Sequence, residues 1–270
     1  MKKLKIGVIG CGNMGEAVLK GLLAAKGSSC SVLASDPDAS RRNSISRRYG
    51  IKVSDGNLRV SENSEVIVLA VKPRDIDGVL RDISKAALSS KLVISIAAGI
   101  SVLRLEKGLG KNVPVVRAMP NMPALVGCGV TAICSGIHAK KRHVKLAKDI
   151  LSSIGDVIEI DEARMDAVTA ISGSGPAYFF YLVECMIEAA RELGLGEEDA
   201  SNLVVKTAIG AARVLEERIE SPQILRAKVA SKGGTTEAAF RVFESKGFKE
   251  ILKEAIRAGH ARSKELGAGG

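Results

Sequence analysis

The stretch Ile6-Gly7-Val8-Ile9-Gly10-Cys11-Gly12-Asn13-Met14-Gly15 decides the fold of the N-terminal part of the chain. A β-branched run enters a Gly-x-Gly-x-x-Gly pattern, after which apolar residues recur at helical spacing. In a strand–turn–helix unit the first glycine makes the turn, the second lets backbone approach a pyrophosphate, and the third lets the helix pack on the strand. The phosphates then lie on free N–H groups at the helix N-terminus. The stretch therefore predicts a dinucleotide site.

An acidic residue, Asp36, follows about 20 residues after the last glycine, where a ribose-binding carboxylate is expected. It comes directly after a second apolar run at residues 31–34. A carboxylate accepts hydrogen bonds from a ribose 2′-hydroxyl and repels a 2′-phosphate, which favours NAD. Ser35 and the pair Arg41 and Arg42 could instead hold a 2′-phosphate. Both cofactor choices stay open at this point.

Short β-branched runs alternate with longer amphipathic ones from residue 4 to about residue 161. The later strands are expected at residues 66–71, 92–96, 113–116 and 157–160. This alternation predicts a doubly wound, mainly parallel α/β sheet in a domain of residues 1–161. Ligands bind at the carboxyl ends of such strands. There Lys72 could meet cofactor phosphate or hydroxyls and Asn121 could orient substrate or nicotinamide, although each is equally compatible with a strand-end or turn residue.

No strands are expected in residues 162–270, which predict an all-α domain. The helices are expected at 162–171, 176–193, 197–217, 222–230, 238–244 and 249–266, with Ser221 capping the fourth. The helix at 176–193 is apolar on nearly every face and must be buried all round. A domain of about a hundred residues cannot cover it alone, so we predict a homodimer through this domain.

A second chemical site is expected at residues 230–237. Ser231, Gly233, Gly234, Thr235 and Thr236 lie directly before a helix. They offer free N–H donors, hydroxyls and the positive end of the helix dipole, which suits a carboxylate ligand. The alternative is that one threonine only caps the helix.

Composition narrows the class of protein. The formal net charge is +10, yet aromatic residues make up 3% and tryptophan is absent, which disfavours single-stranded nucleic-acid binding. Five cysteines show no C-x-x-C spacing, so neither a disulfide framework nor a metal site is predicted. No apolar run reaches eighteen residues, so no membrane span is expected. A cytoplasmic enzyme with a small anionic ligand fits these features.

The chain resembles the pyrroline-5-carboxylate reductase family along essentially its full length, through IGVIGCGNMG, LAVKP, SIAAG, VRAMPNMP, SGSGPAY and VASKGGTTEAAF. The resemblance implies an N-terminal Rossmann-type doubly wound sheet followed by an all-α dimerisation domain. It implies reduction of the imine 1-pyrroline-5-carboxylate to L-proline by NADPH or NADH, the last step of proline biosynthesis. It also implies dimers that build a larger ring, such as a decamer.

The resemblance also assigns site residues. Thr236 would lie beside the ring nitrogen as the catalytic residue, and Asn121 joins the loop at 231–236 in substrate binding. Many members prefer NADPH, whereas Asp36 is an acid where the phosphate would lie, so the preference is open. The cofactor-binding residues would be Ile9, Gly10, Cys11, Gly12, Asn13, Met14, Gly15, Ser35, Asp36, Asn57, Ala70, Val71, Lys72, Pro73, Ile96, Ala97 and Ala98.

Two other functions fit these residues less well. A 3-hydroxyacid dehydrogenase of similar architecture would carry a catalytic lysine in the helix after its glycine-rich turn, and residues 177–193 contain none. A non-catalytic NAD-sensing regulator would leave the loop at 231–236 without a purpose, and no basic recognition helix is visible.

Overall fold

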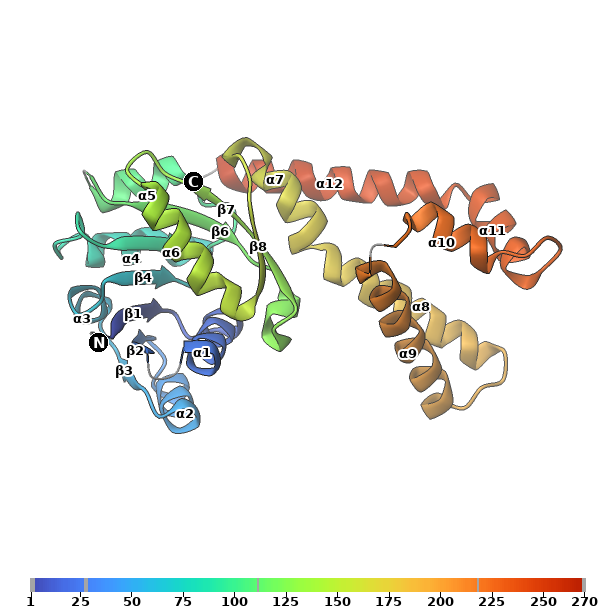
Figure 1. Ribbon diagram of the computed structural model, residues 1–270, viewed down its shortest axis with the longest axis horizontal. Helices are drawn as coiled ribbons and strands as arrows, with labels where there is room; N and C mark the ends of the chain where they lie inside the picture. The colour runs from blue at the N-terminus through green and yellow to red at the C-terminus, as the bar shows by residue number, and fades with distance from the viewer. Residues whose placement is uncertain (1–2, 27–28, 111, 218, 269–270) are drawn as a thin grey trace. The chain divides into compact units, whose positions relative to one another are not determined.

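The computed structural model describes residues 3–26, 29–110, 112–217 and 219–268 (Figure 1). The chain forms two compact units. The first contains residues 1–174 and 259–270, and the second contains residues 175–258.

The first unit is built on an eight-stranded sheet of order β3-β2-β1-β4-β5-β6-β7-β8. Only β6 and β7 pair antiparallel among neighbouring strands of the described residues. The predicted doubly wound, mainly parallel sheet is thereby confirmed. The strands are β1 (Leu4–Ile9), β2 (Cys30–Ser35), β3 (Lys52–Ser54), β4 (Val66–Leu69), β5 (Leu92–Ser95), β6 (Val115–Met119), β7 (Gly129–Ser135) and β8 (Gly155–Glu159).

Two strands were not anticipated from the sequence. The three-residue β3 is too short to show a periodicity, and β7 (GVTAICS) mixes small residues with only two large apolar ones. In the structure β3 pairs with β2, and β7 pairs with both β6 and β8. These two segments are therefore strands because of their pairing with neighbours and not because of a local sequence pattern.

Helices cover both faces of the sheet because alternate strand residues point to opposite sides. In β4, Val66 and Val68 join one core cluster with Leu19 and Leu151, whereas Leu69 joins another with Leu80. The first face therefore carries α1 (Asn13–Lys26) and α6 (Lys141–Leu151), and the second carries α4 (Ile76–Ile83) and α5 (Val102–Leu109). Fully burying a leucine or isoleucine in such a cluster stabilises the fold by about 1.5–3 kcal/mol. The shorter elements of the sheet region are α2 (Ala39–Tyr49), α3 (Asn57–Glu62), η2 (Pro73–Asp75), η3 (Met122–Val126) and η4 (Ser152–Ile154).

The segment after β8 is helical, but it is not one regular helix. A 3₁₀ turn η5 (Glu162–Arg164), a short α7 (Met165–Val168) and a π-helical turn η6 (Thr169–Gly173) follow each other and lead into α8 (Gly175–Glu192). The last part of α12 (Phe248–Ala268), from Gly259 onward, belongs to the first unit.

The second unit contains only helices within its described residues. They are most of α8 and α12 together with α9 (Glu197–Glu216), α10 (Pro222–Val229) and α11 (Thr235–Ser245). Ser221 caps α10 as predicted, since its Oγ accepts the Ile224 N–H at 3.4 Å. Helix α11 begins three residues earlier than predicted, because Gly234 takes the N-cap position.

This second unit has almost no core of its own. Gly175, Ala200 and Val204 are the buried residues among those described in it. By contrast, Phe179 and Tyr181 on α8 are 69% and 67% exposed. So much exposed apolar surface marks an interaction site. Separately, none of the helices in the described ranges has the length and apolar character that a bilayer crossing requires.

Candidate dinucleotide and carboxylate sites

The glycine loop between β1 and α1 shows three different roles for its three glycines. Gly10 has φ +93°, and a Cβ there would come within 2.7 Å of the Ala70 carbonyl oxygen. A Cβ at Gly15 would overlap the Gly10 carbonyl oxygen, so this glycine lets α1 pack against the strand. A Cβ at Gly12 would meet nothing within 4 Å. Gly12 thus faces open space that a pyrophosphate can occupy at the start of α1.

A cavity of about 480 Å³ opens at this loop. It lies at the carboxyl ends of β1, β4, β5 and β6, where the strand order reverses between β1 and β4. The predicted residues that line it are Gly12, Asn13, Met14, Ala70, Val71, Lys72, Pro73, Ile96, Ala98 and Asn121. It is also lined by Arg41, which the sequence suggested only as an alternative phosphate partner, and by Pro120 and Met122, which flank Asn121 in the motif VRAMPNMP. Leu125 and Gly173, which the sequence did not suggest, complete the lining.

Four other residues that were predicted to bind the cofactor are buried behind the cavity and do not line it. Ile9, Gly10, Cys11 and Ala97 are buried at the strand ends. Burial raises the pKa of the Cys11 thiol to about 12, with the Asp36 carboxylate adding to the effect, so this thiol stays protonated. A protonated, buried thiol is not a nucleophile.

Asp36 is 8% exposed and holds the glycine loop directly. Its Oδ2 accepts the Cys11 N–H at 2.8 Å and its Oδ1 accepts the Asp38 N–H at 2.9 Å. Each carboxylate oxygen has a further lone pair, so a contact to a ribose hydroxyl stays a prediction. Arg41 donates to the Cys11 carbonyl at 3.0 Å, whereas Arg42 donates to the Asp36 carbonyl at 3.0 Å. Arg41 is therefore the arginine of this pair that lines the cavity.

Ser35 and Asn57 lie together beside this carboxylate region but outside the cavity lining. The Ser35 hydroxyl donates to Asn57 Oδ1 at 2.9 Å, and Asn57 Nδ2 donates to Asp82 Oδ2 at 3.2 Å. Both predicted contacts to the cofactor therefore remain predictions.

A second cavity, of about 450 Å³, shares Pro73 and Ala98 with the first. Its remaining lining residues are Arg74, Gly99, Ile100, Arg104, Thr169, Ser174, Gly259, Arg262, Ser263 and Leu266. The sequence singled out none of these as ligand contacts. Their proximity is not visible in the sequence, because the end of α12 meets α7 across a long separation, the 97 residues between Asp166 and Ser263.

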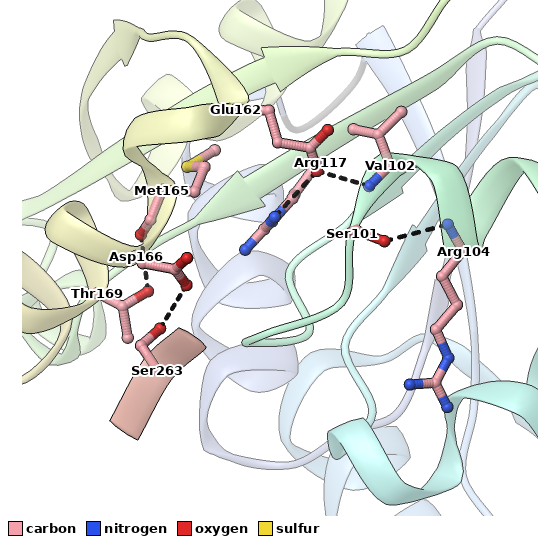
Figure 2. A network of polar contacts seen from close by, with 9 residues as sticks. All are labelled: Ser101, Val102, Arg104, Arg117, Glu162, Met165, Asp166, Thr169 and Ser263. Atoms are coloured by element: carbon pink, nitrogen blue, oxygen red, sulfur yellow. Dashed lines mark hydrogen bonds and ion pairs between the residues drawn. The ribbon is translucent and has the colours of Figure 1, made fainter. Parts of the chain in front are cut away.

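Hydrogen bonds and an ion pair hold the segment after β8 against the rest of the first unit (Figure 2). Glu162 accepts the Arg117 guanidinium at 3.0 Å and the Val102 N–H at 2.7 Å. Further along, Ser263 donates its hydroxyl to Asp166 Oδ1 at 2.7 Å. Arg117 is 7% exposed, and removing one partner of such a pair leaves an uncompensated charge.

The predicted carboxylate loop lies in the second unit. Gly233 has φ +72°, which favours glycine, and a Cβ at Gly234 would come within 2.5 Å of Ser231 Oγ. The Gly234 N–H donates to the Ser231 carbonyl at 3.0 Å, which closes the turn. Since α11 begins at Thr235, the N–H groups of Thr235 and Thr236 point out of its first turn and have no acceptor within the helix.

One donor of this loop is used by the protein itself. The Gly233 N–H donates to Glu237 Oε2 at 2.5 Å, and Arg241 donates to the other oxygen at 3.1 Å. The hydrogen bond from Gly233, followed by that from Arg241, holds the pKa of Glu237 below its ordinary value. A negative charge thus lies at the loop that is predicted to bind a carboxylate. Separately, no cluster of three or more potential metal ligands occurs among the described residues.

The glycine loop, the crevice where the strand order reverses and the open face of Gly12 define a dinucleotide-binding protein of the Rossmann type. The comparisons with known proteins identify the group more closely. This chain belongs to the pyrroline-5-carboxylate reductase family.

Two family models match the chain. The model for pyrroline-5-carboxylate reductase dimerisation matches residues 162–266, and that for NADP oxidoreductase, coenzyme F420-dependent, matches residues 5–99. The pyrroline-5-carboxylate reductase of Pseudomonas aeruginosa is 40% identical over 98% of both chains.

Solved structures agree with the family assignment. A pyrroline-5-carboxylate reductase from Coxiella burnetii has a TM-score of 0.90 at 36% identity, covering 98% of this chain and 99% of the other. A pyrroline carboxylate reductase from Plasmodium falciparum with NADP bound has a TM-score of 0.88 at 33% identity, covering 99% of both. The predicted fold and family are confirmed.

Proposed function

We propose that this protein reduces 1-pyrroline-5-carboxylate to L-proline with NADPH or NADH, as the last step of proline biosynthesis. The observation that carries the proposal is the presence, in one chain of this family, of a dinucleotide cavity with an open Gly12 and a glycine-rich loop at the start of α11. When bound, the reduced nicotinamide would supply a hydride to the imine carbon. A proton, taken from solvent, would be added to the ring nitrogen, which converts the imine to an amine.

In this proposal the chain's own residues bind and orient the two ligands. The start of α1 holds the pyrophosphate, and Ser231, Gly233, Gly234 and Thr235 hold the substrate carboxylate. The Thr236 hydroxyl hydrogen-bonds the ring nitrogen and favours its protonated form. Much of the rate would come from orientation, since two correctly placed reactants avoid a large entropy cost.

The direct test is an assay of the purified protein with 1-pyrroline-5-carboxylate and each reduced cofactor. Oxidation of the cofactor should match the appearance of proline, measured by amino-acid analysis. Lack of turnover with both cofactors, in protein that binds the dinucleotide, would contradict the proposal.

The choice of cofactor is tested at Asp36. Asp36→Ser should raise the ratio of kcat/KM for NADPH to that for NADH, because it removes a carboxylate that repels a 2′-phosphate. Since the same carboxylate accepts two backbone N–H groups, Tm should also fall, and the ratio is the relevant readout. Arg41→Ala should change the ratio in the opposite direction. A ratio unaffected by Asp36→Ser would show that Asp36 serves the loop alone.

We also propose that the second unit forms a homodimer and that dimers assemble into a larger ring, such as a decamer. The match to a dimerisation model and the scarcity of buried residues in this unit support the dimer. The match also begins at residue 162, which supports a functional boundary between domains of residues 1–161 and 162–270. The five free cysteines suit a reducing compartment, so we infer a cytoplasmic location.

The dimer predicts a large effect of charge on α8. Tyr181→Glu and Met186→Glu should give monomers or aggregates in sedimentation, because each buries an unpaired charge in the interface. Ile137→Glu is the matched control, since Ile137 is 83% exposed on the first unit and should tolerate the change. Native-sized particles from both α8 variants would show that α8 is not the interface.

Glu237 gives a prediction about substrate affinity. Glu237→Gln keeps an oxygen that can accept the Gly233 N–H but removes the negative charge near the substrate carboxylate. The KM for 1-pyrroline-5-carboxylate should fall by a small factor at low salt and less at high salt, because charges exposed to solvent interact weakly. Glu244→Gln on the same helix should leave KM unchanged. An unchanged or higher KM in Glu237→Gln would mean that the charge does not act on the substrate.

A further inference from the structure

Asn121 joins three pieces of the first unit that are distant in sequence. It is 9% exposed and stands in the loop after β6. Its Oδ1 accepts the Val130 N–H at 2.9 Å, next to the start of β7. Its Nδ2 donates to Ser172 Oγ at 3.3 Å, within the π-helical turn. Both ends of this amide are therefore occupied by the protein.

The π-helical turn brings backbone to the wall of the first cavity. The Ser174 N–H donates to the Thr169 carbonyl at 2.8 Å, a bond that spans five residues and makes the turn wider than an α-helix. Gly173, at the end of this turn, lines the cavity beside Asn121. A Cβ at Gly173 would come within 2.6 Å of Met119 Cε, the flexible end of a side chain from the last residue of β6, so the turn lies close to this strand end. Single π-turns are frequent at functional sites.

The remainder of this segment is anchored elsewhere. Glu162 binds Arg117 at its beginning and Asp166 binds Ser263 in its middle, as Figure 2 shows. The Asn121–Ser172 bond acts at the far end, one residue from Gly173. Loss of the Asn121–Ser172 bond would therefore loosen the cavity wall at Gly173, while the rest of the segment stays anchored.

We infer that Asn121 and Ser172 are positioning residues that hold the π-helical turn, and with it Gly173, at the nicotinamide side of the cofactor cavity. The side follows from the strand order, because β4, β5 and β6 lie on the opposite side of the β1 crevice from β2 and β3, where the adenosine half binds. The inference rests on the proposed function in so far as the ligand is a nicotinamide dinucleotide.

This role predicts a separation between binding and rate. The pyrophosphate is held at Gly12 and the start of α1, which the turn does not form. The affinity for the dinucleotide should therefore change little when the turn loosens. The nicotinamide ring would lose one wall, and small errors in the placement of reacting groups cost up to about a hundredfold in rate.

The first test is Ser172→Ala. We expect kcat to fall by about threefold to a hundredfold, the Kd for NADPH to stay within about threefold, and the fluorescence of bound NADPH to change because the nicotinamide environment changes. Ser172→Thr, which keeps the hydroxyl, should restore both signals. Ser101→Ala is the matched control, since it removes the bond from the Arg104 N–H to Ser101 Oγ at 3.2 Å and should lower Tm without changing kcat or the fluorescence.

The second test combines Asn121→Ala with Ser172→Ala. If the two residues act as one unit, the double variant should be no slower than Asn121→Ala alone. Effects on kcat that multiply in the double variant, or a slow Asn121→Ala beside a silent Ser172→Ala, would show that Asn121 contacts a ligand directly, and either would overturn the inference. A lower Tm with unchanged kcat and fluorescence in Ser172→Ala would overturn it as well.

Failure of the proposed reaction would be distinguishable from failure of this inference. Absence of proline formation by the unaltered protein would contradict the proposed function alone. The fluorescence of bound NADPH needs no turnover, so the comparison of Ser172→Ala with Ser172→Thr still decides the positioning role.

Discussion

Thr236→Val should lower kcat for proline formation by about tenfold to a thousandfold while the Kd for NADPH stays unchanged. In the proposed role, the Thr236 hydroxyl makes a hydrogen bond that strengthens as the imine nitrogen gains a proton, and groups of this kind contribute rate factors of that order. Thr236 is the second residue of α11 and is half-buried, so a valine of similar shape leaves the loop geometry in place. Steady-state kinetics with varied imine and varied cofactor measure the two effects separately.

The competing explanation is that Thr236 only stabilises the start of α11. A lost helix cap costs about 1 kcal/mol of stability and no activity. However, the N-cap position of α11 is occupied by Gly234, without a side-chain cap. Thr236→Ser should restore kcat if the hydroxyl acts on the substrate. Full kcat with a lowered Tm in Thr236→Val would decide for the structural role.

Gly12→Val should raise the Kd for NADPH by at least about tenfold, which corresponds to about 1.4 kcal/mol, and should change Tm little. A Cβ at Gly12 would meet no protein atom within 4 Å, so the valine would enter the space proposed for the pyrophosphate. The N-cap glycine Gly196 provides the matched control, because a Cβ there also meets nothing within 4 Å. Gly196→Val should change Tm by as much as a bulky residue before a helix normally does, and it should leave the Kd for NADPH unchanged.

The glycine variants also separate binding from folding. Gly15→Ala should lower Tm strongly, because its Cβ would overlap the Gly10 carbonyl oxygen. Titration of NADPH fluorescence together with thermal unfolding measures both properties in each variant. Unchanged affinity in Gly12→Val would mean that the pyrophosphate does not lie over this glycine.

The sequence by itself determined the parts of this protein whose causes are local. The strand, turn and helix at residues 4–26 follow from contiguous residues, so the glycine roles and the cavity edge at Gly12, Asn13 and Met14 could be predicted. The alternation of strands and helices likewise predicted the parallel sheet, and the apolar surface of α8 predicted an interface. The glycines and threonines at a helix start predicted the loop before α11, and the family motifs added the reaction.

The tertiary structure alone decided features that depend on residues distant in the chain. Asp36 uses both oxygens on backbone N–H groups, one of them 25 residues away, which its position after a strand did not reveal. Asn121 meets Ser172 across 51 residues, and Ser263 meets Asp166 across 97. Local propensity carries no information on such pairs, because only the packing of the sheet and its connections brings them together. The contribution of Gly173 to the first cavity and the part of the second cavity formed by α12 therefore became visible only once the chain was folded.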